Sequence, residues 1–228
     1  MSQVYHCAAI DLGATSGRVI VGTYNGESLE LTEVHRFPNA FHRLNKNDYW
    51  DIGGLFTHIR EGLKKAKAQF PELVSCGVDT WGVDYALLDK SGRLLFPVHA
   101  YRDARTEPIL KRIEDSGNAE ELYSWTGNSM INYNSGLQLA ETIEAFPFAK
   151  EAVDRALFLP DYFNFLLSGT AVNEFSIAST AQLLDLHGER FHPEALKYFN
   201  IPEHWLKGPE KAGRKLGKVR DIEGLESV

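Results

Sequence analysis

The chain has 228 residues, of which 43% are hydrophobic, and it carries a net charge of −7. This length and composition allow one large domain or two small ones, with enough apolar residues for a sizeable core. The negative charge argues against a nucleic-acid or anionic-membrane surface, because such surfaces need clustered Lys and Arg. We therefore expect a small-molecule partner, no nucleic acid and no membrane.

Cys7 and Cys76 are the two cysteines, and each lies in an apolar stretch. That pattern favours buried thiols in a reducing compartment over a secreted disulfide framework. The N-terminal residues lack the basic and apolar regions of a signal peptide, and no segment reaches the roughly 20 apolar residues of a membrane span. We expect a cytoplasmic protein. The sequence does not predict an oligomeric state.

Three strands are predicted first, over residues 4–10, 18–24 and 29–37, with a turn at Asn25-Gly26 that makes them an antiparallel meander. A helix follows over 51–70, because its apolar residues recur at helical spacing and Asp51 is a suitable N-cap. Further strands are expected at 74–79, 83–88 and 94–96.

Helical spacing dominates from Arg105 onward, in the stretches EPILKRIED, AEELYSW, GLQLAETIEAF and DYFNFLLSG. The chain thus divides into a sheet region at about 1–100 and a mainly helical region at about 101–206. A polar, glycine-punctuated tail at 207–228 is predicted to be a solvated connector.

The stretch AAIDLGATSGRVIVGTY places an acid and a glycine-rich loop between two apolar runs. The loop joins two strands, whereas P-loops and dinucleotide fingerprints open a helix. Its backbone N–H groups and the hydroxyls of Thr15 and Ser16 suit an anion, and Gly13 and Gly17 permit positive φ and close approach. Asp11 would repel bare phosphate, but Mg²⁺ between them makes the arrangement attractive. A plain hairpin turn has the same composition, so this motif alone leaves both interpretations open.

A second stretch, CGVDTWGVDYALLD, repeats the pattern: Asp79 ends a strand, a short loop holds Trp81 and Gly82, and the next strand begins near Asp84. Acids at the ends of neighbouring strands would share one cleft. An accessible indole beside carboxylates offers a sugar a stacking face and hydroxyl acceptors. The alternative is that Trp81 is a core residue and that the acids cap turns.

The stretch AYRDARTEP adds Arg102, Asp103 and Arg105. They suit either ligand contacts or an ion-pair cluster at a helix start. The structural role is favoured for Arg105, and the question stays open for the other two.

Seven segments together resemble, in order, the N-terminal half of the FGGY carbohydrate kinases, of the actin, hexokinase and Hsp70 ATPase superfamily. The segments are DLGATSGR, VHRFPN, YWDI, GVDTWGVDYALLD, YRDART, LPDYFNFLLSG and NEFSIASTAQLLD. Within the family they are most similar to the kinases of L-rhamnulose. Glycerol kinases carry Arg-Glu where Trp81 and Gly82 stand, and xylulokinases carry Met-His-Gly.

The resemblance implies an α/β fold of ribonuclease H type, with a mixed five-stranded sheet, flanking helices and a helical insertion. It implies ATP and Mg²⁺ as cofactors and a ketose as substrate, phosphorylated at C1-OH when the sugar is L-rhamnulose. It assigns Mg²⁺, through water, to Asp11, and the ATP phosphates to Gly13, Ala14, Thr15, Ser16, Gly17 and Arg18. It assigns the sugar to Asp79, Thr80, Trp81 and Gly82, and we expect Asp84, Arg102 and Asp103 to contact the sugar as well.

The chain departs from the family pattern in length. The family's general base is an Asp in an HD segment, and none of the eight His residues here is followed by Asp. We therefore expect no catalytic residue in this chain: the base and the C-terminal nucleotide domain are expected beyond Val228, and residues 1–228 alone should be inactive. The alternatives are a kinase for L-fuculose, L-ribulose or xylulose, and a non-catalytic sugar-binding or regulatory module.

Overall fold

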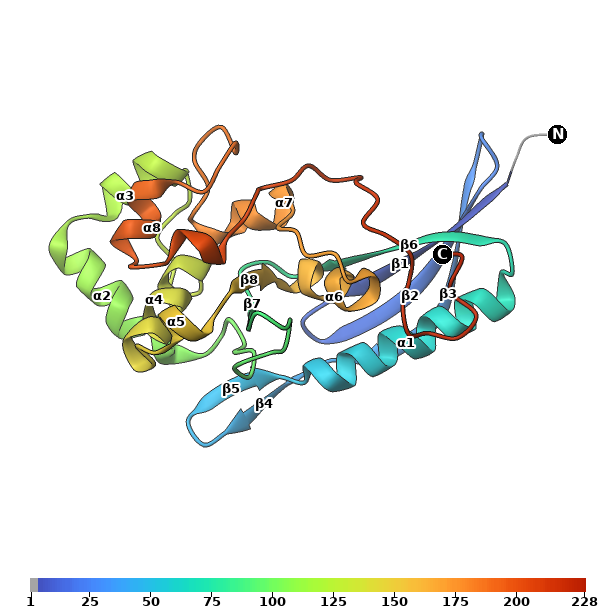
Figure 1. The fold of residues 1–228 in the computed structure, drawn as a ribbon, viewed down its shortest axis with the longest axis horizontal. Coiled ribbons are helices and arrows are strands. Elements are labelled where there is room, and N and C mark those ends of the chain that lie inside the picture. The colour runs from blue at the N-terminus through green and yellow to red at the C-terminus, as the bar shows by residue number, and fades with distance from the viewer. Residues whose placement is uncertain (1–3) are drawn as a thin grey trace.

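A computed structural model describes residues 4–228 and shows a sheet-containing half and a helical half (Figure 1). The strands are β1 (Tyr5–Leu12), β2 (Ser16–Tyr24), β3 (Leu29–Pro38), β4 (Phe41–Leu44), β5 (Asn47–Trp50), β6 (Leu73–Thr80), β7 (Tyr85–Leu88) and β8 (Arg155–Phe158). The α-helices are α1 (Ile52–Gln69), α2 (Glu107–Ser116), α3 (Ala119–Thr126), α4 (Ser135–Ala145), α5 (Ala149–Ala152), α6 (Leu159–Ser168), α7 (Phe175–Ala178) and α8 (Pro193–Tyr198). Short 3₁₀ turns are η1 (Ala104–Thr106), η2 (Ser179–Ala181) and η3 (Glu203–Trp205).

The main sheet has the strand order β3-β2-β1-β6. The first three strands form the predicted antiparallel meander, and β6 pairs with β1 in parallel. The mixed α/β class is confirmed, but the predicted five-stranded sheet is wrong: among the described residues this sheet has four strands. β7 pairs with β8 in a separate ribbon, and the expected strand at 94–96 is reduced to one bridge between Leu88 and Leu94.

Helix α1 forms where the apolar periodicity predicts it. The Asp51 carboxylate accepts a hydrogen bond from the Gly54 N–H at 2.8 Å, which satisfies one of the free donors of the first turn. The helix buries one stripe against the sheet, including Leu55, Ile59 and Leu63. It therefore fixes the sheet from one face, as Figure 1 shows.

The hairpin β4–β5 has no counterpart among the predicted elements. Phe41 pairs with Trp50 and Leu44 with Asn47. Along β5 burial alternates, so Asp48 and Trp50 point inward. The hairpin brings Trp50 to the loop that follows β6.

Two hydrophobic cores share the β7–β8 ribbon. Successive side chains of a strand point to opposite faces, so Ala86 and Leu88 join the core of the sheet half while Tyr85 and Leu87 join that of the helical half. On β8, Leu157 lies in the first core and both of its strand neighbours lie in the second. The ribbon is thus a wall common to both cores.

The C-terminal segment runs back from the helical half to the sheet half (Figure 1). Its expected role as a solvated connector is wrong for residues 219–228. Four apolar residues at spacings of three are buried in the core of the sheet half, namely Val219, Ile222, Leu225 and Val228. The polar composition of the segment hid this short buried pattern.

No helix among the described residues has the length and hydropathy to cross a bilayer. The expectation of two buried thiols is wrong for Cys7, which is exposed on β1, whereas Cys76 is partly buried. Burial alternates along β1, a central strand of the sheet, and Cys7 lies on the exposed face.

Candidate functional site

Asp11 and Asp79 lie on neighbouring strands at the same end of the sheet. Asp11 on β1 is the register partner of Asp79 on parallel β6 and of Arg18 on antiparallel β2. Paired residues on adjacent strands project to the same face of the sheet. The predicted neighbourhood of the two acids is therefore confirmed.

The carboxylate of Asp11 is held by Arg18. Nε and Nη2 of Arg18 each lie 2.8 Å from Oδ2 of Asp11. Both side chains are accessible, with 44% of Arg18 and 39% of Asp11 exposed. Exposed ion pairs of this kind contribute up to about 1 kcal/mol, so a ligand can replace either partner at small cost.

The loop between β1 and β2 is a tight turn held from β3. The Gly13 N–H donates to the Ser16 carbonyl at 2.9 Å. Asn39, just after β3, donates its side-chain amide to the Gly13 carbonyl at 2.8 Å and its backbone N–H to the Thr15 carbonyl at 3.0 Å. Thr15 is exposed and Ser16 half-buried, so this frame leaves the side chain of Thr15 accessible.

Gly17 is required for packing and not for its backbone freedom. Gly13 and Gly17 do not use the positive φ that glycine permits. A Cβ on Gly17 would lie 2.3 Å from the ring of Phe37, which is buried beneath the loop. The absence of a side chain lets β3 support the turn closely.

The loop after β6 contains a strained turn at Val83. The Asp84 N–H donates to the Gly82 carbonyl at 2.9 Å across Val83, whose φ is 67°. This three-residue turn with positive φ is rare, and more so for a β-branched residue. Thr180 accepts the Val83 N–H at 3.0 Å, and Ser135 donates to the Val83 carbonyl at 2.6 Å. Segments 52 and 97 residues away thus hold the turn in place.

Trp81 is half-buried and has a fixed orientation. Its ring lies 4.2 Å from that of Trp50, and its indole N–H donates to Oδ2 of Asp84 at 2.8 Å. Trp50 donates to the same oxygen at 2.7 Å. Trp81 packs against the core of the sheet half but is only partly buried, so the interpretation of it as a wholly buried core residue is wrong.

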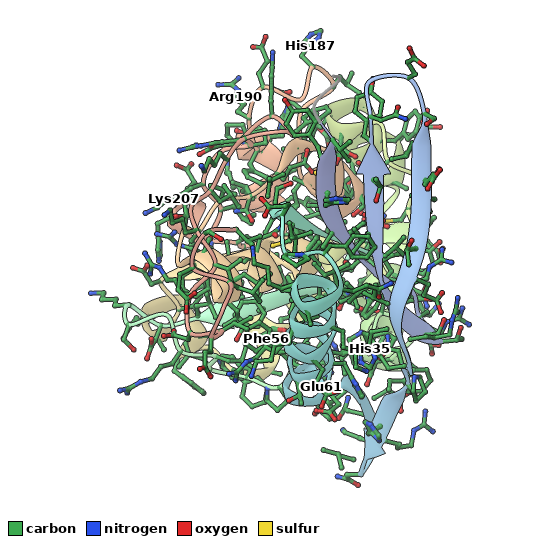
Figure 2. All side chains as sticks on the ribbon, turned by 90° about the vertical axis from the view of Figure 1, so that its right-hand side faces the viewer. His35, Phe56, Glu61, His187, Arg190 and Lys207 are labelled. Atoms are coloured by element: carbon green, nitrogen blue, oxygen red, sulfur yellow. The ribbon has the colours of Figure 1, made fainter. Side chains whose placement is uncertain are left out.

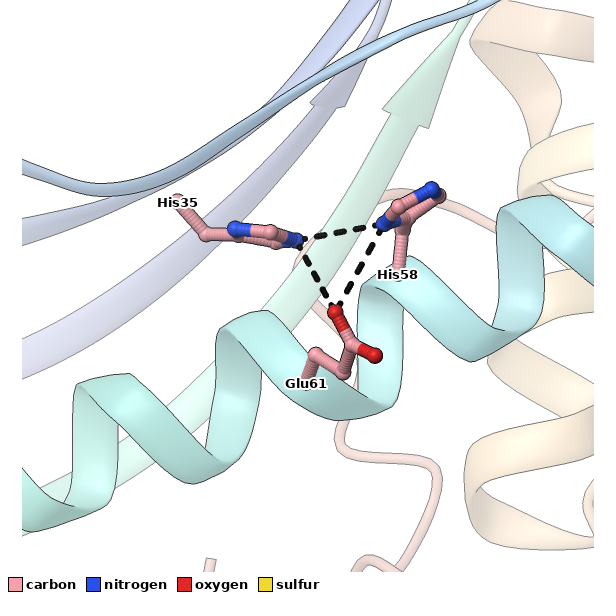
Figure 3. Close-up of side chains that lie close together, drawn as sticks. All are labelled: His35, His58 and Glu61. Atoms are coloured by element: carbon pink, nitrogen blue, oxygen red, sulfur yellow. Dashed lines mark hydrogen bonds and ion pairs between the residues drawn. The ribbon is translucent and has the colours of Figure 1, made fainter.

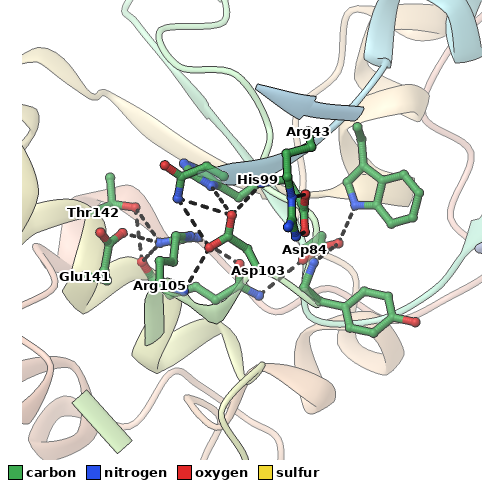
Figure 4. Close-up of polar contacts among 12 residues, drawn as sticks. Arg43, Asp84, His99, Asp103, Arg105, Glu141 and Thr142 are labelled. Carbon is green, nitrogen blue, oxygen red and sulfur yellow. Dashed lines mark hydrogen bonds and ion pairs between the residues drawn. The ribbon is translucent and has the colours of Figure 1, made fainter. Parts of the chain in front are cut away.

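Asp84 is the centre of this arrangement (Figure 4). Only 1% of it is exposed, and it also accepts from the amide of Gln138 at 3.2 Å and the backbone N–H of Tyr101 at 3.2 Å. Burial raises the pKa of Asp84 to about 6, although these donors and the two indoles oppose the shift. The expectation that Asp84 contacts sugar directly is corrected, because the protein itself occupies its oxygens; Asp84 orients Trp81.

Arg102, Asp103 and Arg105 differ in how far they are exposed. Asp103 is 4% exposed and accepts from the backbone N–H groups of Asp48 at 2.6 Å and Arg105 at 2.8 Å, so it joins β5 to η1. Arg105 is enclosed and contacts Gln138 and the carboxylate of Glu141 (Figure 4). We expected Asp103 to contact the sugar directly, but its carboxylate accepts backbone N–H groups instead. The structural role favoured for Arg105 agrees with its contacts.

Arg102 remains accessible for a ligand. Its guanidinium lies 5.3 Å from the ring centre of Tyr101 and its Nε donates to the Tyr101 hydroxyl at 3.0 Å. Tyr101 in turn donates its backbone N–H to Asp84. Asp84 therefore links the loop that carries Trp81 to the segment that carries Tyr101 and Arg102.

A cavity of about 400 Å³ adjoins Asp79. Asp161, near the start of α6, lines it and accepts the Glu174 N–H at 3.1 Å. Burial, and the nearby charge of Glu174 to a lesser degree, raise the pKa of Asp161 to about 7, opposed by that hydrogen bond. Sequence reasoning gave Asp161 no role, although it lies in the segment LPDYFNFLLSG. Asn39, Trp50 and Thr180 were missed in the same way, and each lies in a segment used for the family resemblance.

Comparison with known families gives one extended match. Residues 6–223 match the model of the N-terminal domain of the FGGY family of carbohydrate kinases. A rhamnulokinase of Bacteroides thetaiotaomicron is 41% identical over 228 residues, covering 96% of this chain and 46% of that protein. A rhamnulokinase of Klebsiella pneumoniae is 36% identical over 217 residues, covering 94% of this chain and 44% of that protein. The chain spans about half the length of the curated relatives it matches.

Solved structures share the fold at low identity. A gluconate kinase from Lactobacillus acidophilus superposes with a TM-score of 0.86 at 15% identity, over 99% of this chain and 47% of that one. A ligand-bound xylulose kinase from the same organism gives 0.85 at 15% identity, over 98% and 46%. The fold is that of these sugar kinases.

Proposed function

The chain belongs to the FGGY family of carbohydrate kinases, and we propose that the protein containing it transfers the γ-phosphoryl group of ATP to the C1 hydroxyl of L-rhamnulose. The products are L-rhamnulose 1-phosphate and ADP. The rhamnulokinases with which the chain shares 41% and 36% identity support this sugar over other ketoses. A cytoplasmic location accords with this activity.

One observation carries the proposal: Asp11 and Asp79 are register partners, and each opens a loop with a different set of polar groups. The loop after Asp11 carries hydroxyls and closely spaced backbone N–H groups. The loop after Asp79 carries an oriented indole. Phosphoryl transfer depends mainly on alignment and charge compensation, and adjoining loops for the two substrates satisfy the first requirement.

The first loop suits a metal-bound triphosphate. Asp11 is an accessible carboxylate, the oxygen donor type that Mg²⁺ prefers, and its side chain is 39% exposed. Thr15, Ser16 and the backbone near Gly13 would hold the phosphate oxygens. Mg²⁺ held by Asp11 would supply positive charge that neutralises the phosphate oxygens. Arg18, released from Asp11, would add a permanent positive charge beside them.

The second loop suits the sugar. Trp81 is partly exposed, and Asp84 and Trp50 fix the position of its ring. Trp81 and Gly82 stand where glycerol kinases carry a charged pair, and their apolar character suits a deoxy-ketose with a methyl end. Asp79, Thr80 and Arg102 would contact hydroxyls. Asp84 acts through Trp81 as a positioning residue.

Chemistry requires a base for the C1 hydroxyl and exclusion of water. We propose, as the family resemblance implies, that an Asp outside residues 1–228 serves as this base and that closure of a second domain excludes water, which otherwise competes as acceptor. We accordingly propose that residues 1–228 supply the sugar and phosphate contacts and do not turn over alone.

The test is a coupled ADP-release assay on the intact protein with MgATP and four ketoses: L-rhamnulose, L-fuculose, L-ribulose and xylulose. We expect kcat/KM for L-rhamnulose to exceed the others at least about tenfold. Trp81→Leu should raise KM for the sugar, whereas Tyr123→Leu, at an exposed aromatic residue of α3, should not. Preference for another ketose would contradict the substrate, and sugar binding by calorimetry without any ADP release would favour a binding module.

A further inference from the structure

Three side chains converge on the face of the sheet that α1 covers (Figure 3). His35 comes from β3, and His58 and Glu61 come from successive turns of α1. Nε2 of His35 lies 3.3 Å from Nδ1 of His58 and 3.6 Å from Oε2 of Glu61, and the last two atoms are 3.7 Å apart. The same three atoms therefore form one closed triangle.

The fold positions this triangle from two elements. Gly62 brings α1 close to the sheet, since a Cβ there would lie 2.3 Å from Val19 and 3.3 Å from the Cβ of His35. The ring of His58 stacks on Phe37, at 4.5 Å between centres and 8° between planes. The side chains of His35, His58 and Glu61 are 10%, 38% and 53% exposed. The cluster is thus a shallow site with His35 at its floor, at the border of α1 and β3 (Figure 2).

The spacing fits an ion better than hydrogen bonds alone. The two contacts to Glu61, at 3.6 and 3.7 Å, are longer than hydrogen bonds, which seldom exceed about 3.2 Å. A triangle with sides of 3.3, 3.6 and 3.7 Å has a circumradius of about 2.05 Å, close to the Zn–N and Zn–O bond lengths of about 2.0–2.2 Å. One point is therefore at bonding distance from all three atoms.

We propose that His35, His58 and Glu61 bind a zinc ion that joins α1 to β3. Two imidazoles and one carboxylate favour Zn²⁺ over Mg²⁺ and Ca²⁺, which take oxygen ligands. The exposure of Glu61 leaves the outer side open, so a water molecule completes four-coordination. The site lies on the α1 face of the sheet and does not rest on the proposed kinase function.

Lys65 determines which nitrogen of the His35 ring carries the proton, and zinc binding must move that proton. Its ammonium donates to Nδ1 of His35 at 2.9 Å, so in the ion-free protein the ring proton of His35 is on Nε2 and faces His58. Zinc at Nε2 moves that proton to Nδ1, where it needs an acceptor. Lys65 must then turn into solvent, where it is free to move because it is exposed. Lys65→Gln supplies an amide oxygen as that acceptor and should tighten zinc binding.

The experiment uses the intact protein freed of metal with a chelator, then titrated with ZnCl₂ by calorimetry and with CoCl₂ as a spectroscopic probe. We expect one zinc ion per chain, a tetrahedral Co²⁺ absorption band that zinc abolishes, and a melting temperature raised by roughly 2–5 °C when zinc is a hundredfold above its Kd. His58→Phe keeps the stack on Phe37 but removes the ligand nitrogen, and Glu61→Gln removes the carboxylate. Each should weaken zinc at least about tenfold.

His42→Phe, at an exposed histidine of β4, is the matched control and should bind zinc as the unaltered protein does. Asp11→Asn should do so as well, which separates this site from the loop after β1. The proposal is overturned if the unaltered protein binds no zinc, or if His58→Phe and Glu61→Gln bind it with unchanged affinity. Zinc binding lost in Asp11→Asn but kept in His58→Phe would also overturn it.

Discussion

Trp81 donates its indole N–H to Oδ2 of Asp84, the same buried oxygen that accepts the indole N–H of Trp50. Two rings from distant parts of the chain are thus oriented by one atom. The arrangement explains how a half-buried tryptophan keeps a single orientation beside the loop.

Asp84→Ala should destabilise the protein by about 3 kcal/mol, because it leaves two indole N–H groups and the Gln138 amide without their acceptor in a buried site. Urea unfolding of the intact protein measures this change. Asp115→Ala, at an exposed position of α2, should stay within about 0.5 kcal/mol of the unaltered protein. Equal stability of the two variants would contradict the role assigned to Asp84.

Gly17→Ala should destabilise by about 1–3 kcal/mol, since its Cβ would lie 2.3 Å from the Phe37 ring. Phe37→Leu creates space and should compensate in the double variant. A double-mutant cycle of unfolding free energies should give a coupling of at least about 1 kcal/mol. Strict additivity would show that the glycine is needed for some other reason.

Thr180→Val should lower stability by about 1–3 kcal/mol, because it removes the acceptor of the Val83 N–H while keeping the volume. Thr180→Ser keeps the hydroxyl and is the matched control. Thr180→Val should also raise KM for the sugar, because the loop that contains the turn at Val83 carries Trp81. If both variants behaved alike in unfolding and in KM, the hydroxyl would not be what holds the turn.

Asp161 should make stability depend on pH. Its folded-state pKa of about 7 lies above the ordinary value of 3.8, so the folded protein binds the proton more tightly than the unfolded chain. The stabilising contribution is complete below about pH 4 and is lost as the pH rises towards 7. Asp161→Asn keeps an acceptor for Glu174 and does not titrate.

The stability of Asp161→Asn relative to the unaltered protein should therefore increase between about pH 5 and pH 8, by on the order of 2 kcal/mol. Urea midpoints at the two pH values measure the change. A difference between the two proteins that is independent of pH would show that Asp161 ionises normally.

Asp11→Asn should lower kcat at least about a hundredfold in the intact protein, because it removes the charge expected to position Mg²⁺. Its stability should change by less than about 1 kcal/mol, since the pair with Arg18 is exposed. Measuring kcat and the urea midpoint on the same preparations separates the two effects. A loss of activity explained by unfolding would remove Asp11 from the mechanism.

Local patterns predicted much of this fold. The meander, α1 and its N-cap, and the helices α2, α3, α4 and α6 follow from period-two and period-3.6 spacing and from capping residues. The fifth strand was misplaced because β7 has strand character but pairs with β8, which is set by tertiary contacts. At the pairing of Leu88 with Arg155 the two strands are 67 residues apart in the chain. The buried tail was missed because four apolar residues are too few for a periodic signal.

The candidate site was predicted only in part, because tertiary contacts again decide what the sequence pattern leaves open. Residue type and position at strand ends predicted that Asp11 and Asp79 are neighbours, which their register pairing confirms, whereas the ligand roles of Asp11, Asp79 and Trp81 stay predictions. Asp84 and Asp103 were taken for ligand contacts because an acid after a strand has the same composition whether it faces a ligand or a backbone N–H. Their partners, such as Trp50 and Asp48, come from a hairpin that no sequence signal predicted.

The β7–β8 ribbon couples the unfolding of the two halves of the chain. Because alternate side chains of the ribbon belong to opposite cores, the ribbon cannot melt in one half and stay folded in the other. The halves should therefore lose structure in one cooperative transition.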